Sequence, residues 1–106
     1  MPTARHITLP SGFLASGVAC GIKPSGREDV ALIVGKADVS AAVVTTTNQV
    51  IGAPVQWIRT ILPRGAGRVR GIVINSGVSN VCMGRRGLRD AEEMAARTAG
   101  HLATSK

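Results

Sequence analysis

The scarcity of large side chains is the feature that most restricts how this chain can fold. Apolar residues make up 44% of its 106 residues, yet Phe13 and Trp57 are the only aromatic ones. The others are mainly Ala, Val, Ile and Leu, which remove less area from water per residue than aromatic side chains do. Thirteen glycines add to the entropy cost of folding. A chain of this length forms one domain or less, and we expect an isolated monomer to be marginally stable; the alternative is a small domain of ordinary stability.

The strong positive charge of the chain does not by itself identify a specific partner. The net charge is +7, and seven of the ten arginines lie between residues 59 and 89. Such a cluster attracts phosphates, nucleic acid or acidic metabolites. The chain has only two aromatic residues that could stack on bases, and it has no recognisable nucleic-acid motif. We therefore expect a solvated basic face, or a surface for an acidic partner, and no specific binding of nucleic acid.

The cysteines and the hydropathy pattern predict an ordinary intracellular protein. Cys20 and Cys82 fit no metal-ligand spacing and have no His cluster beside them, so no metal site is predicted. Residues 1–10 hold no apolar run of signal-peptide length, and no segment approaches the roughly 20 apolar residues that span a bilayer. We expect free thiols, no membrane association and a reducing, cytoplasmic location.

The order of the predicted elements indicates the fold class. Residues 1–11 are predicted to be irregular, and residues 12–106 to form the structured region. The order strands, helix, strand, helix predicts an α/β fold, or alternatively α+β, with helices and a mixed sheet. Strands are expected at 12–22, 30–34, 41–47 and 69–74, helices at about 54–62 and 88–102, and turns at 23–26 and 35–38. The 30–34 strand is expected to be buried on both faces, and the last helix to bury Leu88, Ala91, Ala95, Ala99 and Leu102.

One polar loop stands out as a candidate binding site. Asn75, Ser76 and Gly77 follow the apolar strand 69–74 directly, and Asn80 comes three residues later. Ligands of open α/β sheets tend to bind where loops leave the carboxyl ends of strands. Alternatively, these side chains cap their own backbone in an ordinary turn. Spacing alone leaves both interpretations open. The loop matches neither a phosphate-binding nor a dinucleotide-binding fingerprint.

No catalytic residue can be identified from the residues themselves. The run Thr45-Thr46-Thr47 offers hydroxyl groups, but a threonine needs an adjacent base or a free α-amine to act as a nucleophile, and this run supplies neither. His6 and His101 have no carboxylate partner that spacing can identify, so we expect both at the surface.

Several motifs together resemble the ornithine acetyltransferase family, also called bifunctional glutamate N-acetyltransferase. They occur in the order and at the spacing of that family and cover nearly all of residues 11–103. Some positions depart from the family pattern, namely Thr45, Val78, Ser79, Val81 and Met83. The matching residues fall into four motifs: Gly12-Phe13, Ala15–Ala19 and Gly21–Lys23; Asp29–Ile33; Thr46–Val50 and Ala53–Val55; and Asn75–Gly77 with Asn80, Cys82 and Gly84.

The resemblance implies a specific chemistry for a complete enzyme. Members of the family move an acetyl group from N-acetylornithine to glutamate, and some also use acetyl-CoA as the donor. Their precursor cuts itself before a threonine, whose new α-amine activates its own hydroxyl, and an oxyanion hole stabilises the intermediate. Both features lie beyond the segment matched here. The resemblance therefore implies that this chain is the N-terminal part of an acetyltransferase of arginine biosynthesis. It implies no catalytic residue in this chain and no cofactor. Its partners would be the C-terminal part of the enzyme or its own copies. The alternatives are a non-enzymatic interaction module and a basic module for anionic ligands.

Overall fold

The computed structural model describes residues 6–104, which form two compact units. The first unit contains the described residues up to Ser40 together with Arg68–Gly77. The second contains Ala41–Gly67 and the described residues from Val78 onward. Of the segment 1–11 predicted to be irregular, residues 6–11 form turns and bends, and residues 1–5 lie outside the described part.

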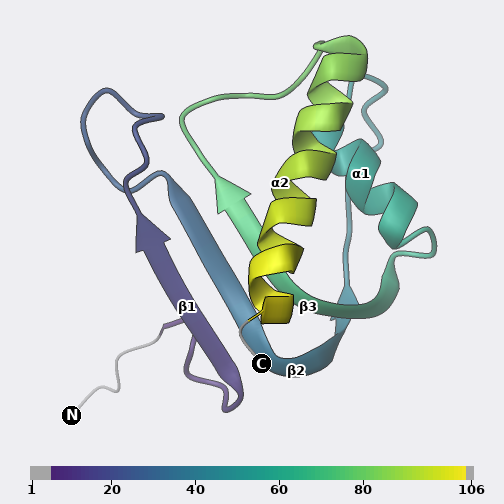
Figure 1. Ribbon diagram of the computed structural model, residues 1–106. Helices are drawn as coiled ribbons and strands as arrows, with labels where there is room; N and C mark the ends of the chain where they lie inside the picture. The colour runs from purple at the N-terminus through teal and green to yellow at the C-terminus, as the bar shows by residue number, and fades with distance from the viewer. Residues whose placement is uncertain (1–5, 105–106) are drawn as a thin grey trace. The chain divides into compact units, whose positions relative to one another are not determined.

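A three-stranded sheet accounts for most of the first unit (Figure 1). Its strands are β1 (Phe13–Val18), β2 (Val30–Ala42) and β3 (Ala66–Asn75), with β2 in the middle. β1 pairs antiparallel with β2, and Figure 1 shows β3 also running against β2. With two helices in the second unit, this confirms the predicted combination of sheet and helices. The three strands in the described part of the chain are antiparallel, where a mixed sheet was expected.

The expected turn at residues 35–38 is wrong, because β2 continues through it. Strand pairing with β1 ends where Phe13 faces Gly35, and the next N–H, that of Lys36, still donates to the Gly12 carbonyl at 2.9 Å. Two side chains of β3 bind the backbone of this part of β2. Arg70 Nε donates to the Gly35 carbonyl at 2.9 Å, and Arg68 Nη2 donates to the Asp38 carbonyl at 2.7 Å. These bonds outweigh the local turn signal of the Gly-Lys-Ala-Asp sequence.

The expected strand at 41–47 is also wrong, since β2 ends at Ala42. Side chains in the following segment bond to their own backbone. The Asn48 N–H donates to Thr46 Oγ1 at 3.0 Å, and the Val50 N–H donates to Asn48 Oδ1 at 2.9 Å. Such local bonds compete with the pairing of strands. The threonines therefore begin a loop, despite their preference for strands.

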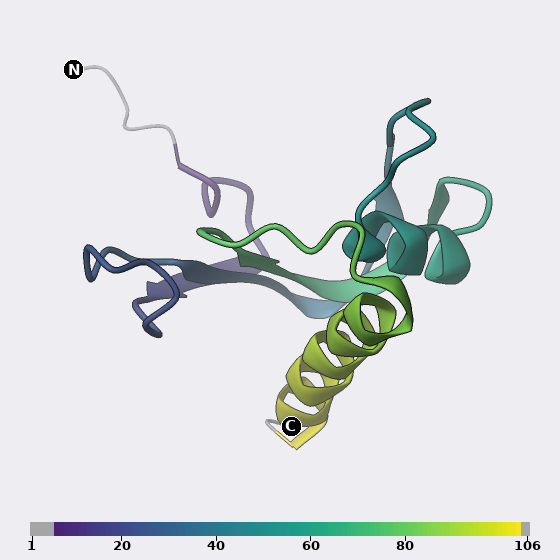
Figure 2. The same cartoon turned by 90° about the horizontal axis from the view of Figure 1, so that it is seen from above.

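The second unit is built on two helices that pack on each other (Figure 2). They are α1 (Ala53–Ile61) and α2 (Gly84–Thr104), so α2 begins four residues earlier than predicted. Pro54 lies in the first turn of α1, where its missing N–H leaves no gap in the hydrogen bonding. On α2, Ala91 is buried, but Ala99 is exposed and the expectation that it is buried is wrong. Its place on the packed face is taken by Met94 and Thr98, which are half-buried.

The apolar side chains of the described residues are poorly covered. Only Ala53 and Ala91 count as buried apolar residues among them, at 6% and 5% exposure. The run 30–34 is half-buried, so the expectation that it is buried on both faces is wrong. The edge strands expose large residues, with Leu14 of β1 at 62% and Ile72 of β3 at 53%. These two units leave exposed the kind of surface that folded proteins usually cover.

Candidate functional site

The structure divides the predicted polar loop between the two units. Asn75 ends β3, and Ser76 and Gly77 follow it within the first unit. Asn80 belongs to the second unit. The two parts have different hydrogen-bonding surroundings and are described separately.

A buried carboxylate organises the surroundings of the first part. Asp29 is only 4% exposed, and its side chain accepts hydrogen bonds from three backbone N–H groups. Oδ1 accepts from Cys20 at 2.8 Å, and Oδ2 accepts from Ile22 at 2.7 Å and Lys23 at 3.0 Å. These bonds, that from Cys20 foremost, hold the pKa of the Asp29 carboxyl far below its usual range. The ionised group therefore fixes a segment that has no regular secondary structure.

The backbone of Asp29 joins this segment to the polar loop. Its N–H donates to the Val18 carbonyl at 3.0 Å, and its carbonyl accepts from the Ser76 N–H at 2.8 Å. Gly77 has a φ of 93°, and a Cβ there would come within 2.8 Å of Lys23 Cγ and 3.1 Å of Ile22 Cγ2. Glycine is thus required both for this backbone conformation and for the close approach of residues 22–23.

The side chains of Asn75 and Ser76 remain available for a ligand. Neither the amide nor the hydroxyl makes a hydrogen bond to any residue that the structure describes. One backbone hydrogen bond, from Ser76 to Asp29, holds the loop, and these side chains do not cap their own turn here. A primary amide offers both donors and an acceptor, and a hydroxyl offers one donor with two acceptor lone pairs. This part of the loop can therefore bind a neutral polar group such as an acetamide.

Asn80 instead holds the two helices of its unit. Its Nδ2 donates to the Gly87 carbonyl at 2.7 Å, and its own carbonyl accepts from the Ala53 N–H at 2.9 Å. One bond reaches the first turn of α2, and the other reaches the start of α1. Its Oδ1 is buried and has no hydrogen-bond partner among the described residues. The Asn80 side chain thus bonds to a helix seven residues further along the chain and does not cap its own turn.

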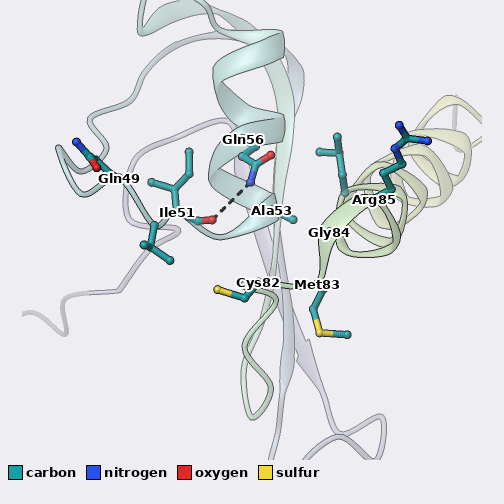
Figure 3. A pocket seen from close by; sticks show the side chains of 10 residues that line it. Gln49, Ile51, Ala53, Gln56, Cys82, Met83, Gly84 and Arg85 are labelled. Carbon is teal, nitrogen blue, oxygen red and sulfur yellow. Dashed lines mark hydrogen bonds between the residues drawn. The ribbon is translucent and has the colours of Figure 1, made fainter.

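The second unit also contains a pocket that the sequence did not predict (Figure 3). Its volume is about 410 Å³, and it lies between residues 49–56, which lead into α1, and residues 82–88, which begin α2. Figure 3 shows Ile51 and Gln56 on one side, joined by a 3.5 Å hydrogen bond, and Arg85 on the other. The lining is largely apolar, with Gln49, Gln56 and Arg85 as its long polar side chains. The two lining segments are distant in the sequence, so no local motif indicated the pocket.

The threonine run and several arginines are engaged in the fold. Arg59 Nη2 donates to Thr45 Oγ1 at 2.9 Å and to the Thr46 carbonyl at 2.6 Å. The partners of the Thr45 and Thr46 hydroxyls are Arg59 and the Asn48 N–H, and neither partner is a base that could activate a hydroxyl. Arg68 and Arg70 likewise bond to the backbone of β2. Three arginines of the basic stretch thus serve the chain's own structure, which weakens the case for a module that binds anionic ligands.

Both histidines are exposed, and the described residues hold no cluster of metal-ligating side chains. His6 is exposed, as predicted, and its Nδ1 lies 2.8 Å from Thr8 Oγ1; His101 is exposed as well. Within residues 6–104 no three His, Cys, Asp or Glu side chains gather in a way that could hold a metal ion. None of the described helices is long and apolar enough to cross a membrane.

Comparison with known proteins shows which family this chain resembles in sequence. The family model described as "ArgJ family" matches residues 14–106. Proteins named "Arginine biosynthesis bifunctional protein ArgJ" are similar in sequence. Those of Mycobacterium tuberculosis (strain H37Rv) and Thermobifida fusca are 44% and 45% identical over 100 residues, which is 93% of this chain and 24% of each relative. The chain thus spans about a quarter of the length of these relatives.

Solved structures agree with the sequence comparison. The ornithine acetyltransferase of M. tuberculosis, determined in complex with ornithine, matches with a TM-score of 0.72 and 44% identity, over 80% of this chain and 44% of that chain. The ArgJ protein of Bacillus halodurans matches with a TM-score of 0.81 and 35% identity, over 88% of this chain and 48% of that one. The resemblance seen in the sequence motifs is confirmed, and the chain belongs to the ArgJ family.

Proposed function

We propose that this chain forms the N-terminal part of an acetyltransferase that moves an acetyl group from N-acetylornithine to glutamate in arginine biosynthesis. The observation that carries the proposal is the shared fold with an ornithine acetyltransferase at 44% identity. That protein was solved with ornithine bound, which supports a small amino-acid substrate for the complete enzyme. We place the activity in the cytoplasm and assign it no cofactor, with acetyl-CoA as a possible second acetyl donor.

The chain by itself is proposed to be inactive. Acyl transfer needs an activated nucleophile and donors that stabilise the tetrahedral oxyanion. Thr45 and Thr46 are bound by Arg59 and have no base among their hydrogen-bond partners. The Thr8 hydroxyl lies 2.8 Å from His6 Nδ1, but no oxyanion-stabilising site lies beside that pair among the described residues. The exposed apolar side chains of β1 and β3 give a physical reason for a partner. That partner is the C-terminal part of such an enzyme or, in its absence, further copies of this chain.

Within the proposed enzyme, the Asn75–Gly77 turn is the substrate-binding element of this chain. Its free amide and hydroxyl suit the acetamide of N-acetylornithine. Asn80 bonds to both helices of the second unit, and no contact with substrate is assigned to it.

A chimera tests the proposal directly. The matched 100 residues of the M. tuberculosis relative are replaced by this chain, and transfer of labelled acetyl from N-acetylornithine to glutamate is measured. The 106-residue chain alone serves as the control. We expect activity in the chimera and none in the chain alone. A folded but inactive chimera would contradict the proposal, as would acetyl transfer by the chain alone.

A further inference from the structure

The conformation of residues 20–23 depends on one side chain. These residues lie between β1 and β2 and form bends rather than a strand or helix. Three of their four N–H groups donate to the Asp29 carboxylate. Hydrogen bonds to an ionised acceptor are shorter and stronger than neutral ones. Removing that acceptor leaves this segment without its main constraint.

Asp29 also anchors the turn that follows β3. Its carbonyl accepts from Ser76 at 2.8 Å, although the two residues are far apart in the sequence. Its N–H is bound to Val18 at the end of β1. One residue therefore connects β1, residues 20–23 and the start of the polar turn.

Side-chain packing also joins residues 22–23 to the turn at Gly77. The side chains of Ile22 and Lys23 occupy the space beside Gly77 that any Cβ would need. The aliphatic part of Lys23 lies along this glycine, and its Nζ reaches the Glu28 carbonyl at 3.4 Å. Displacing residues 22–23 would remove the surface against which Gly77 packs.

We propose that Asp29 is a positioning residue for the Ser76–Gly77 turn. Its carbonyl fixes Ser76, and its carboxylate fixes the residues that pack on Gly77. The Asn75 and Ser76 side chains are thereby left free to face a ligand. The inference rests on the proposed function only where it extends to binding of an acetylated amino acid by this turn.

The experiment uses the full 106-residue chain and measures backbone amide exchange by mass spectrometry. Asp29→Asn keeps the size of the side chain but removes its charge and half of its acceptor capacity. Asp38→Asn is the matched control, because Asp38 is exposed on β2, the strand that begins directly after Asp29, and its carboxylate accepts no hydrogen bond from a described residue. We expect exchange about tenfold faster at residues 20–23 and at 76–77 in Asp29→Asn, from the loss of charged hydrogen bonds. The control should leave both segments unchanged.

A second variant keeps the test decisive if Asp29→Asn unfolds the whole unit. Gly77→Ala leaves the carboxylate intact but pushes against Lys23. We expect faster exchange at residues 22–23 as well as at 77, because the two segments are coupled. An effect confined to residue 77 would overturn the proposal, and so would unchanged exchange at 76–77 in Asp29→Asn. Rapid exchange of residues 20–23 in a wild-type chain whose β1–β2 amides are protected would also overturn it.

Binding is measured separately, by titrating each variant with N-acetylornithine. If the wild-type chain binds, Asp29→Asn should weaken the affinity about tenfold, in proportion to the exchange effect. Equal affinity of the wild type and Asp29→Asn would contradict the role in binding. If the wild-type chain does not bind, substrate binding by this turn fails, while the exchange data still decide whether Asp29 positions the turn.

Discussion

The Asn80 side chain and Gly87 are fitted to each other in two ways. Asn80 Nδ2 donates to the Gly87 carbonyl at 2.7 Å, and Asn80 Oδ1 occupies the space that a Cβ on residue 87 would take. Glycine is unfavourable within a helix such as α2, so the close packing against Asn80 explains why residue 87 is a glycine. The same helix contains Gly100, around which nothing lies within 4 Å of such a Cβ.

This pair of glycines predicts opposite effects of one substitution. Gly87→Ala should destabilise the helical unit by about 1–3 kcal/mol, the usual cost of forcing a methyl group into a packed site. Gly100→Ala should raise stability by up to about 1 kcal/mol, through the higher helix propensity of alanine. Urea unfolding followed by circular dichroism, at one fixed protein concentration, measures both. Equal effects of the two substitutions would show that Asn80 does not constrain position 87.

The lowered pKa of Asp29 predicts a dependence of the 20–23 segment on pH. A carboxyl whose folded pKa is depressed stabilises the fold above its unfolded pKa, about 3.9, and loses that contribution as pH falls toward the folded value. Protection of the amides of Cys20, Ile22 and Lys23 should thus be constant near neutral pH and decline only below about pH 4. Amide exchange, corrected for its intrinsic pH dependence, measures this. Asp29→Asn should abolish the acid-dependent decline, and its persistence would assign the effect to another group.

The thiol of Cys20 is predicted to react more slowly than an ordinary exposed cysteine. The hydrogen bond to the Asp29 carboxylate, with desolvation and the negative charge of Asp29, raises the pKa of this thiol. Less thiolate is present at neutral pH, so alkylation by iodoacetamide is slow. Asp29→Asn should speed the alkylation of Cys20. Cys82 belongs to the other unit and serves as the internal reference in the same mass spectra. A rate at Cys20 that is independent of residue 29 would contradict the interpretation.

The uncovered apolar surface predicts self-association or poor folding of the isolated chain. β1 and β3 are both edge strands, and they expose Leu14 and Ile72. Unpaired, apolar edges of a sheet favour pairing with further chains. Sedimentation velocity at several concentrations should show association, and thermal melts should depend on concentration. A monomer with a cooperative melt that is independent of concentration would disprove this prediction.

Because the Asn75 amide is free, we predict that any binding of substrate by this chain depends on it. If N-acetylornithine binds to the chain, Asn75→Ala should abolish that binding, because it removes both the donors and the acceptor of the amide. Ser79→Ala is a suitable control, since Ser79 is exposed and its hydroxyl has no hydrogen-bond partner among the described residues. Calorimetric titration compares the two. Binding that survives Asn75→Ala would place the site elsewhere. No acetyl adduct should form on any threonine of the chain in these samples.

Local sequence patterns were sufficient for most elements and for the family. Pro54 at the start of α1, the apolar run of β3 and the helical periodicity of α2 each depend on neighbours in the sequence, which is why they could be predicted. The four motifs between Gly12 and Gly84 together indicated the family for the same reason.

Only the tertiary structure decided the roles of particular residues. Arg70 reaches a backbone 35 positions away and keeps β2 extended where the sequence favours a turn. The loop motif treated Asn75 and Asn80 as one group, yet one carries a free amide and the other joins two helices. Asp29 was part of a motif but gave no signal of its function, because its partners are backbone N–H groups that any sequence supplies. Hydrogen bonds between distant segments depend on the path of the chain in space, and residue types alone do not specify that path.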